Sequence, residues 1–401
     1  MGDGSIQNEE RVSHGKLFLP SLVISYFATG PLAVLVALFL IDIGKAFNVS
    51  VGVMGQINTL YSIVAVVFAL LIGVLSVRFE HKLLLLTGLL FIGISSVGCF
   101  LASDFSVMLV SYSLSGLGWA MVSPMSVTLI GEHFPLDKRA NAIGWIIAGG
   151  SLSYVIGAPV IALIASLGNW RLALLVFVIP ISFVSLLLAF VGLPSTSRSQ
   201  QSTIDGKTYL KSFKGILSNR SATACLTGDA LRMAAFVAVY FYAISFVRQR
   251  FSLSADLASI VLIGGALCYA LGGLVGGRFV NKFGRKPSTV LTALLASAFT
   301  IAYVYTPNLW LSFALIFAAS WFFGMVASAA NSLTLEQVPK FRGTMMSIDS
   351  AALNLGSAIG TAMGGLVLLS FDYEGLGSAL GAMGIVAAIV FYLLAIDPTK
   401  N

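Results

Sequence analysis

Long apolar stretches alternate with short polar connections along the whole chain. The apolar core of a bilayer is about 30 Å thick and needs about 20 mostly apolar residues in one helix, so each stretch predicts a transmembrane helix. Twelve such stretches are present, at residues 17–41, 52–76, 83–102, 106–130, 140–166, 171–193, 221–247, 256–279, 287–306, 309–334, 343–370 and 376–397.

The apolar stretches have no strand-like alternation. Residues 83–94 read LLLLTGLLFIGI, whereas a strand of a membrane barrel alternates apolar and polar positions. In lipid, such stretches satisfy their backbone hydrogen bonds only as helices. The sequence therefore predicts an all-α membrane protein with twelve transmembrane helices.

One longer polar segment divides the chain. Residues 194–220 are rich in Ser, Gln and Lys, a composition typical of a flexible linker, with a short amphipathic helix expected near residues 209–217. The predicted organisation is an N-terminal six-helix half at residues 1–193, this linker, and a C-terminal six-helix half at residues 221–401.

Composition and charge place the chain in a membrane. Hydrophobic residues make up 58% of the sequence and charged residues 10%, against about 25% charged residues in a soluble domain. If the N-terminus is inside, 18 Lys and Arg residues fall on the inner side and 4 on the outer side. The positive-inside rule then predicts that both termini and the linker are cytoplasmic, and it explains the net charge of +7 without a nucleic-acid partner.

The two halves repeat one another at an offset of 204 residues. The matched pairs are Phe47 and Phe251, Ser50 and Ser254, Gly73 and Gly277, Arg78 and Lys282, Lys82 and Lys286, Glu132 and Glu336, Pro135 and Pro339, and Lys138 and Arg342. Duplicated six-helix halves predict a pseudo-symmetric bundle with a substrate site near the bilayer midplane, between halves that rock against each other.

A basic loop recurs between the second and third helices of each half. The C-terminal copy, residues 277–286, reads GRFVNKFGRK, and the N-terminal copy, residues 73–82, reads GVLSVRFEHK. With the repeat, these loops make the chain resemble the major facilitator superfamily over nearly its whole length. The resemblance implies that fold and a conformational latch. Its expected residues are Gly73, Arg78, Lys82, Gly277, Asn281, Lys282, Gly284, Arg285 and Lys286.

Two further features bear on the direction and coupling of transport. In the fifth span, Gly149-Gly150 and Gly157-Ala158-Pro159 resemble the glycine–proline pattern of drug and metabolite antiporters, which favours export. In the fourth span, Tyr112 stands where efflux members carry an arginine implicated in proton handling. Coupling to protons is therefore expected to use other residues.

Few polar residues interrupt the apolar spans. Charges there are costly and usually face a cavity or a partner. Asp229 and Arg232 are one helical turn apart in the seventh span, and Asp349 and Asn354 lie in the eleventh. The first two form either a proton-coupling site or a static ion pair. Asp349 is either a second coupling group or a helix N-terminal carboxylate paired with Arg342.

Uncharged candidates for substrate contact lie on spans that line the cavity in the resembled family. They are Tyr26, Tyr112, Trp119, Tyr240, Tyr242, Trp321 and Asn331, with Asn58 on the second span. Aromatic side chains with polar tips suit organic substrates.

No catalytic or nucleotide-binding motif accompanies these features, so the chain is expected to be neither an enzyme nor ATP-driven, and no cofactor or metal is expected. The prediction is a secondary active transporter of small organic molecules, exporting them in exchange for protons, as a monomer in a prokaryotic inner membrane. The alternative is a uniporter or proton symporter of an anionic metabolite, held by Arg232. A membrane sensor without transport activity is the third hypothesis.

Overall fold

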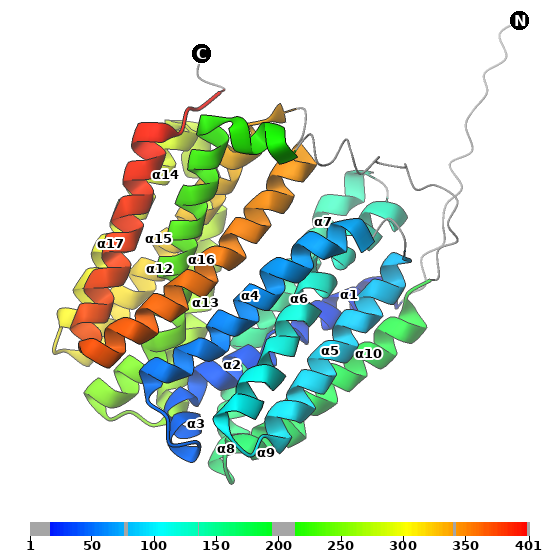
Figure 1. The fold of residues 1–401 in the computed structure, drawn as a ribbon, viewed down its shortest axis with the longest axis vertical. Coiled ribbons are helices and arrows are strands. Elements are labelled where there is room, and N and C mark those ends of the chain that lie inside the picture. Colours follow the sequence, from blue (N-terminus) through cyan, green and yellow to red (C-terminus); the bar gives the residue numbers. More distant parts are fainter. Residues whose placement is uncertain (1–16, 76–78, 135, 195–212, 340–341, 399–401) are drawn as a thin grey trace, which may run out of the picture.

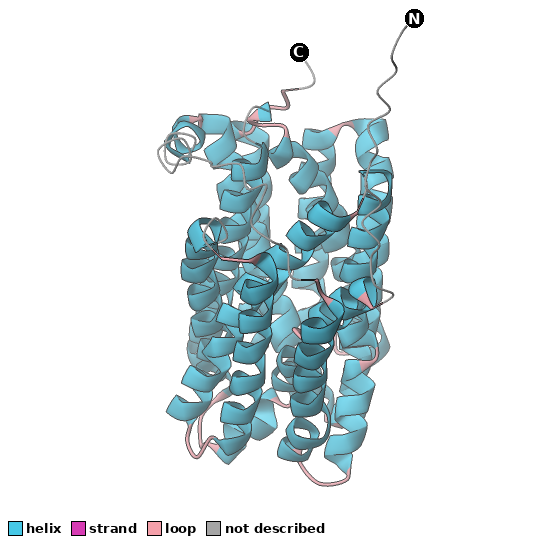
Figure 2. Ribbon diagram, turned by 90° about the vertical axis from the view of Figure 1, so that its right-hand side faces the viewer, coloured by secondary structure: helices cyan, strands magenta, loops and turns pink. Residues whose placement is uncertain are grey.

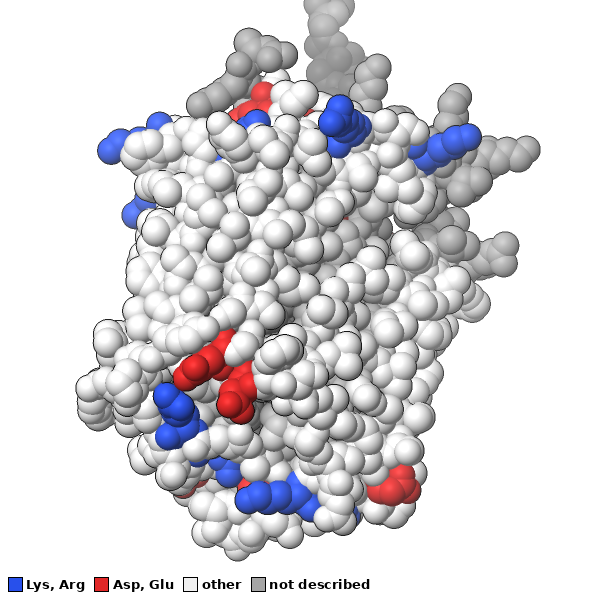
Figure 3. Space-filling model, turned by 60° about the vertical axis from the view of Figure 1, so that its left-hand side comes forward, with Lys and Arg blue, Asp and Glu red and all other residues white. Residues whose placement is uncertain are grey.

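The computed structural model describes residues 17–398 except 76–78, 135, 195–212 and 340–341. This part of the chain contains helices and no strands, and twelve of its helical segments are long and apolar enough to cross a membrane (Figures 1 and 2). The predicted fold class is confirmed. Charged side chains gather toward the two ends of the molecule and leave a broad uncharged band between them (Figure 3).

Each span of the C-terminal half is one continuous helix. The six helices are α12 (Arg220–Phe251), α13 (Ala255–Phe283), α14 (Arg285–Tyr305), α15 (Leu309–Leu335), α16 (Arg342–Ser370) and α17 (Tyr373–Leu394). Of the linker, residues 213–218 are helical, and the buried Ile216 packs against Ala222 and Met345. The remainder of the predicted amphipathic helix lies outside the described residues.

Three spans of the N-terminal half are interrupted. The first consists of α1 (Phe18–Phe27), α2 (Pro31–Leu38) and α3 (Leu40–Ala46). The fifth consists of α7 (Leu136–Val155) and α8 (Gly157–Ser166), and the sixth of α9 (Trp170–Ala173), the π-helical turn η1 (Leu174–Val178) and α10 (Ile179–Gly192). The continuous helices are α4 (Val51–Leu75), α5 (His81–Leu101) and α6 (Phe105–His133).

Helix starts recur at the offset found in the sequence. The Asp104 side chain accepts from the backbone N–H of Val107 at the start of α6, and Asn308 does the same for Leu311 at the start of α15. Ser50 and Ser254 cap α4 and α13 in the same way. Side-chain oxygens at these positions satisfy N–H groups that have no partner within the helix.

The interruption of the first span has a local cause. Pro31 supplies no N–H group and begins α2, and the Thr29 hydroxyl donates to the carbonyl of Tyr26. A Cβ atom on Gly30 would lie 1.9 Å from the Oγ of Ser153, so only glycine allows the first and fifth spans to approach this closely. The break brings the backbone of Thr29 and Gly30 to the centre of the bundle.

The two halves meet most closely at one end. We call the end at which α1 and α12 begin the proximal end and the opposite end, where α4 and α13 begin, the distal end (Figure 1). The helices α4 and α16 pack together there through glycines, because a Cβ on Gly365 would lie 2.4 Å from the carbonyl oxygen of Gly52. The conformation is therefore closed at the distal end.

Candidate functional site

A cavity of about 380 Å³ lies between the two halves, with walls from α1, α2, α4, α6 and α7 on one side and from α12 and α13 on the other. Aromatic side chains dominate its lining: Tyr26, Tyr61, Tyr112, Trp119, Tyr154, Phe236, Tyr240, Phe241 and Tyr269. None of the described residues that line it carries a charge. A cavity of this size, apolar with few polar groups, is typical of a small-molecule site.

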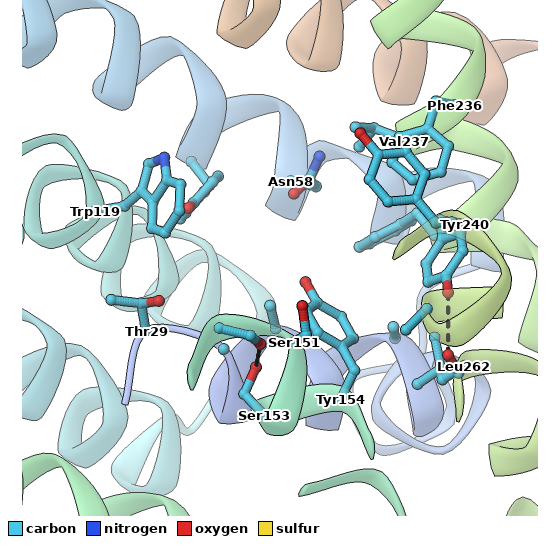
Figure 4. A pocket seen from close by; sticks show the side chains of 18 of the residues that line it. Thr29, Asn58, Trp119, Ser151, Ser153, Tyr154, Phe236, Val237, Tyr240 and Leu262 are labelled. Carbon is cyan, nitrogen blue, oxygen red and sulfur yellow. Dashed lines mark hydrogen bonds between the residues drawn. The ribbon is translucent and has the colours of Figure 1, made fainter. Parts of the chain in front are cut away.

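Some polar groups of the lining are engaged and others are free. The Tyr240 hydroxyl donates to the carbonyl of Leu262 at 3.0 Å, as Figure 4 shows, and Ser153 donates to the carbonyl of Gly150. The hydroxyl groups of four other lining tyrosines have no hydrogen-bond partner among the described residues. These are Tyr61, Tyr112, Tyr154 and Tyr269.

A polar seam between α4 and α16 borders the cavity. The Asn58 amide donates to the hydroxyl of Ser357 at 3.2 Å, and Ser62 donates to the same hydroxyl at 2.9 Å. The hydroxyls of Thr59 and Thr361 are 3.1 Å apart. Asn58 also lines the cavity, so one side chain belongs to both the seam and the site.

An ion pair joins the halves farther toward the distal end. The guanidinium of Arg248 on α12 contacts the carboxylate of Asp42 on α3 at 2.5 and 3.2 Å and donates to the carbonyl of Leu38 at 3.1 Å. Arg250, in contrast, pairs with Glu374 of its own half at 3.6 Å. Opening of the distal end requires the Arg248 contacts to break and leaves the Arg250 pair intact.

A second buried feature, the charge cluster, lies proximal to the cavity within the C-terminal half. Asp229 is fully buried and accepts from the Nε of Arg232 at 2.5 Å and from the Thr334 hydroxyl at 2.8 Å. Arg232 also donates to the Oδ1 of Asn331 at 3.1 Å. Asn331 is exposed and lies on the last turns of α15, near its proximal end.

A second carboxyl group completes the charge cluster. Asp349 of α16 is 1% exposed, and its carboxyl group lies within hydrogen-bonding reach of that of Asp229. Its Oδ1 has no hydrogen-bond partner among the described residues. A second carboxyl group is thus buried beside the ion pair of Asp229 and Arg232. The side chain of Arg342, the partner considered from the sequence, lies outside the described residues.

Tyr269 connects the cavity with the charge cluster. It lines the cavity and stacks on Phe236, with ring centroids 4.7 Å apart and ring planes 22° apart. Its stacking partner Phe236 leads to Arg232 along α12. Phe236 lies one helical turn beyond Arg232 on α12, so both side chains occupy the same helix face.

The structure distributes the predicted substrate-site residues over three places. Tyr26, Asn58, Tyr112, Trp119 and Tyr240 line the cavity, whereas Asp229, Arg232, Asn331 and Asp349 form the charge cluster. The others lie elsewhere. Tyr242 is buried and donates to the carbonyl of Thr361, the backbone of Trp321 packs on Gly272, and Asn354 donates to the carbonyl of Ser350.

Five functional candidates were missed in the sequence: Thr29, Tyr61, Tyr154, Tyr269 and Thr334. The first four line the cavity, from the break in the first span and from the second, fifth and eighth spans. The predicted lining tyrosines came only from the first, fourth and seventh spans. Tyrosines in the middle of every span are the signal that would have found three of these residues.

The latch residues that the structure describes lie at the proximal end. Gly284 has a φ of +90° and joins α13 to α14, a conformation that favours glycine. Arg285 donates to Ser332 at 3.0 Å and lies 4.0 Å from Glu336 and from Asp397.

The other latch residues of this half make fewer contacts. Lys286 lies over the ring of Tyr392, and Asn281 and Lys282 are exposed. Gly277 is loosely packed, because a Cβ atom at this position would lie 3.8 Å from its nearest neighbour, the Oγ of Ser328.

The N-terminal latch has a related arrangement. Lys82 donates to the carbonyl of Leu193 at 2.5 Å, and His81 lies 2.6 Å from Glu132. The pair His81–Glu132 corresponds to Arg285–Glu336 at the offset of 204. Arg78 and the surroundings of Gly73 lie outside the described part of the chain.

Twelve helices around a central cavity, with two halves joined by a seam, define a membrane transporter of small molecules. The sequence profile of the Major Facilitator Superfamily matches residues 21–265 and 230–401, and the chain therefore belongs to this superfamily. It is a multi-pass membrane protein and not an enzyme.

Two relatives match over most of their length. The chain is 22% identical over 386 residues to the "Uncharacterized MFS-type transporter YwfA" of Bacillus subtilis, covering 93% of this chain and 91% of the relative. It is 24% identical over 358 residues to a "Probable sugar efflux transporter" of Helicobacter acinonychis, covering 88% and 89%.

Solved structures show the same fold. A bacterial homologue of the human lysosomal transporter Spinster, in an inward-facing and unoccupied conformation, superposes with a TM-score of 0.76 at 17% identity over 94% of this chain and 96% of that one. The nucleoside transporter NupG superposes with a TM-score of 0.79 at 14% identity over 94% and 99%.

Proposed function

We propose that this chain is a proton-coupled exporter of small organic molecules that works as a monomer in a bacterial inner membrane. The charge cluster carries the proposal. Its two carboxyl groups and single guanidinium are buried, and an unpaired buried charge is strongly unfavourable. A proton bound between Asp229 and Asp349 balances the charge of the cluster.

An exporter loads its substrate while the cavity faces the cytoplasm. The distribution of Lys and Arg supports a cytoplasmic proximal end, so the distally closed conformation is inward-facing. A substrate then enters the cavity from the cytoplasm. The glycine pattern of the fifth span and the sugar efflux relative support the outward direction.

Coupling needs a connection between the substrate and the proton. A substrate packed against Phe236 and Tyr269 alters the surroundings of Arg232, which is paired with Asp229. Displacement of the guanidinium toward or away from Asp229 changes the affinity of the carboxyl pair for a proton. Because Asn331 is exposed near the proximal end of α15, we infer that the proton leaves past it to the cytoplasm.

The experiment compares Asp229→Asn with the matched control Asp256→Asn, an exposed carboxylate at the distal start of α13. Proteoliposomes are loaded in turn with radiolabelled thymidine, glucose and indole-3-ethanol, with and without an imposed pH gradient. We expect Asp229→Asn to abolish transport driven by the pH gradient while exchange without a gradient persists, and Asp256→Asn to behave like the wild type. Normal pH-gradient-driven transport by a stably folded Asp229→Asn protein would contradict the proposal.

The alternative of an anionic metabolite lacks a supporting contact. Arg232 does not line the cavity, and its Nε and one terminal nitrogen are occupied by Asp229 and Asn331. We therefore place this residue in coupling and not in substrate binding.

A further inference from the structure

We propose that the cavity selects uncharged molecules that carry a flat ring and a small number of hydroxyl or carbonyl groups. This inference rests on the proposed function, because it takes the cavity as the transport site. It adds the chemical class of the substrate, which is set by the lining residues and not by the fold.

The absence of charge in the lining excludes charged cargo. No described lining residue is ionised, and the nearest buried charges, Asp229 and Arg232, are engaged with each other. A charged molecule would exchange its hydration shell for aromatic and aliphatic walls without gaining a partner of opposite charge. That transfer is unfavourable, whereas an uncharged molecule avoids it.

The arrangement of rings favours a flat ligand. On the N-terminal wall, Tyr26 and Trp119 are in edge contact at 5.4 Å, and on the C-terminal wall Phe236 is stacked on Tyr269. Figure 4 shows Trp119 and Phe236 on opposite sides of the cavity. The rings of Tyr154 and Tyr240, which belong to different halves, have centroids 6.5 Å apart. A ring held between these walls contacts both halves with stacked or edge geometry.

The unpartnered hydroxyl groups of the lining favour a substrate that forms only a few hydrogen bonds. The hydroxyls of Tyr61, Tyr112, Tyr154 and Tyr269 are unpartnered among the described residues, and each both donates and accepts. Asn58 supplies the one carboxamide of the lining, and its NH₂ group is already engaged with Ser357. The set matches a ring with one to a few hydroxyl or carbonyl groups better than a polyol such as a free sugar, which presents hydroxyls in every direction.

The test uses ligands that share one ring and differ in charge. Indole-3-ethanol is uncharged, indole-3-acetate is an anion and tryptamine is a cation, and glucose serves as the polyol without an aromatic ring. Binding to the purified full-length protein is measured by calorimetry. We expect indole-3-ethanol to bind at least about tenfold more tightly than each of the other three compounds. Equal or tighter binding of a charged indole or of glucose, or no binding of indole-3-ethanol, overturns the proposal.

Variants assign the binding to the cavity. Trp119→Ala and Phe236→Ala should each weaken indole-3-ethanol binding by about tenfold, whereas Trp310→Ala, at an exposed distal tryptophan, should leave it unchanged. Tyr154→Phe should weaken indole-3-ethanol binding by about fivefold but leave binding of 3-methylindole, which lacks the hydroxyl, unaltered. Equal losses for both ligands would show that Tyr154 does not read the hydroxyl group and would count against the proposal.

The two proposals fail separately. If indole-3-ethanol binds without any release of protons into a weakly buffered solution, proton coupling fails and the substrate class stands. If a charged indole binds best while Asp229→Asn still abolishes pH-gradient-driven transport, the substrate class fails and proton coupling stands.

Discussion

The two halves of this transporter share a scaffold but not its chemistry. Helix α5 runs from His81 to Leu101 and α14 from Arg285 to Tyr305, so both ends of these helices match at the offset of 204. Yet the positions of Asp229, Arg232 and Asp349 are occupied in the N-terminal half by Ser25, Ala28 and Trp145. The duplicated scaffold has kept these helix boundaries, while the buried aspartates and arginine that the structure describes lie in the C-terminal copy.

The N-terminal half differs in a second way. Its first, fifth and sixth spans are interrupted, whereas the corresponding helices α12, α16 and α17 are continuous. Gly30, at the break in the first span, corresponds to Ala234 inside α12. The half with irregular backbone supplies Tyr26, Trp119 and Tyr154 to the cavity. Interrupted helices, where backbone groups leave the regular pattern, are tolerated in membranes where they line a cavity.

The largest effect is expected from removal of one charge of the C-terminal half. Arg232→Ala leaves two buried carboxyl groups without their guanidinium and should destabilise the protein by about 3–5 kcal/mol. The double variant Asp229→Ala, Arg232→Ala should recover part of this loss, since it removes a charge of each sign. Thermal unfolding in detergent measures both. A double variant less stable than Arg232→Ala would show that the two residues do not act as a pair.

The second-largest effect is expected at Gly30, which corresponds to Ala234 in the C-terminal half. Gly30→Ala places a Cβ against Ser153 and should cost about 1–3 kcal/mol through overpacking. The control is Gly131→Ala in α6, where a Cβ meets no atom within 4 Å and helix propensity predicts a gain of up to about 1 kcal/mol. Unfolding temperatures that move together in the two variants would contradict the packing explanation.

A smaller effect distinguishes contacts between the halves from contacts within one half. Arg248→Ala removes the pair with Asp42 and should shift the equilibrium toward a distally open state, by about 1 kcal/mol because the pair is partly exposed. Arg250→Ala, which removes a pair inside the C-terminal half, should not shift it. Distances between spin labels on the distal ends of α4 and α16 report the change. If the label distances increase by a similar amount in both variants, Arg248 does not hold the distal end closed.

The smallest effect is expected at the latch pair of the N-terminal half. The planar guanidinium of arginine is always charged and can bond to both oxygens of a carboxylate, so His81→Arg should make the interaction with Glu132 resemble Arg285–Glu336. The expected change in stability is below about 1 kcal/mol. Unfolding temperatures of the wild type and of His81→Arg test it, and a markedly lower unfolding temperature of the variant would contradict it.

The fold was predictable because its determinants are local. Each span is marked by about 20 apolar residues, and the recurring caps Ser50 and Ser254 mark matching helix starts. The pairing of Asp229 with Arg232 was also accessible, since residues three apart on a helix share a face. These predictions required no knowledge of how the helices pack.

The charge cluster as a whole was not predictable. Asp349 meets Asp229 only because α16 packs on α12, and 120 residues of chain separate the two. Tyr154 and Tyr269 reach the cavity through the tilt and rotation of α7 and α13, which hydrophobicity does not specify. Trp321 shows the reverse case, because a residue on an expected lining span lies outside the cavity lining, with its backbone packed on Gly272.

Asn58 belongs to both the cavity lining and the seam, and this links the affinity for substrate to the conformation of the protein. Its side chain borders the cavity and donates a hydrogen bond to Ser357 across the seam. A substrate that binds the carboxamide therefore changes the stability of the contact between the two halves. Linkage is reciprocal: if the cargo favours one shape of the protein by some factor, that shape tightens the hold on the cargo by the same factor. A dissociation constant measured for this transporter therefore always contains the cost of adopting the binding shape, and a substitution at Asn58 changes both quantities at once.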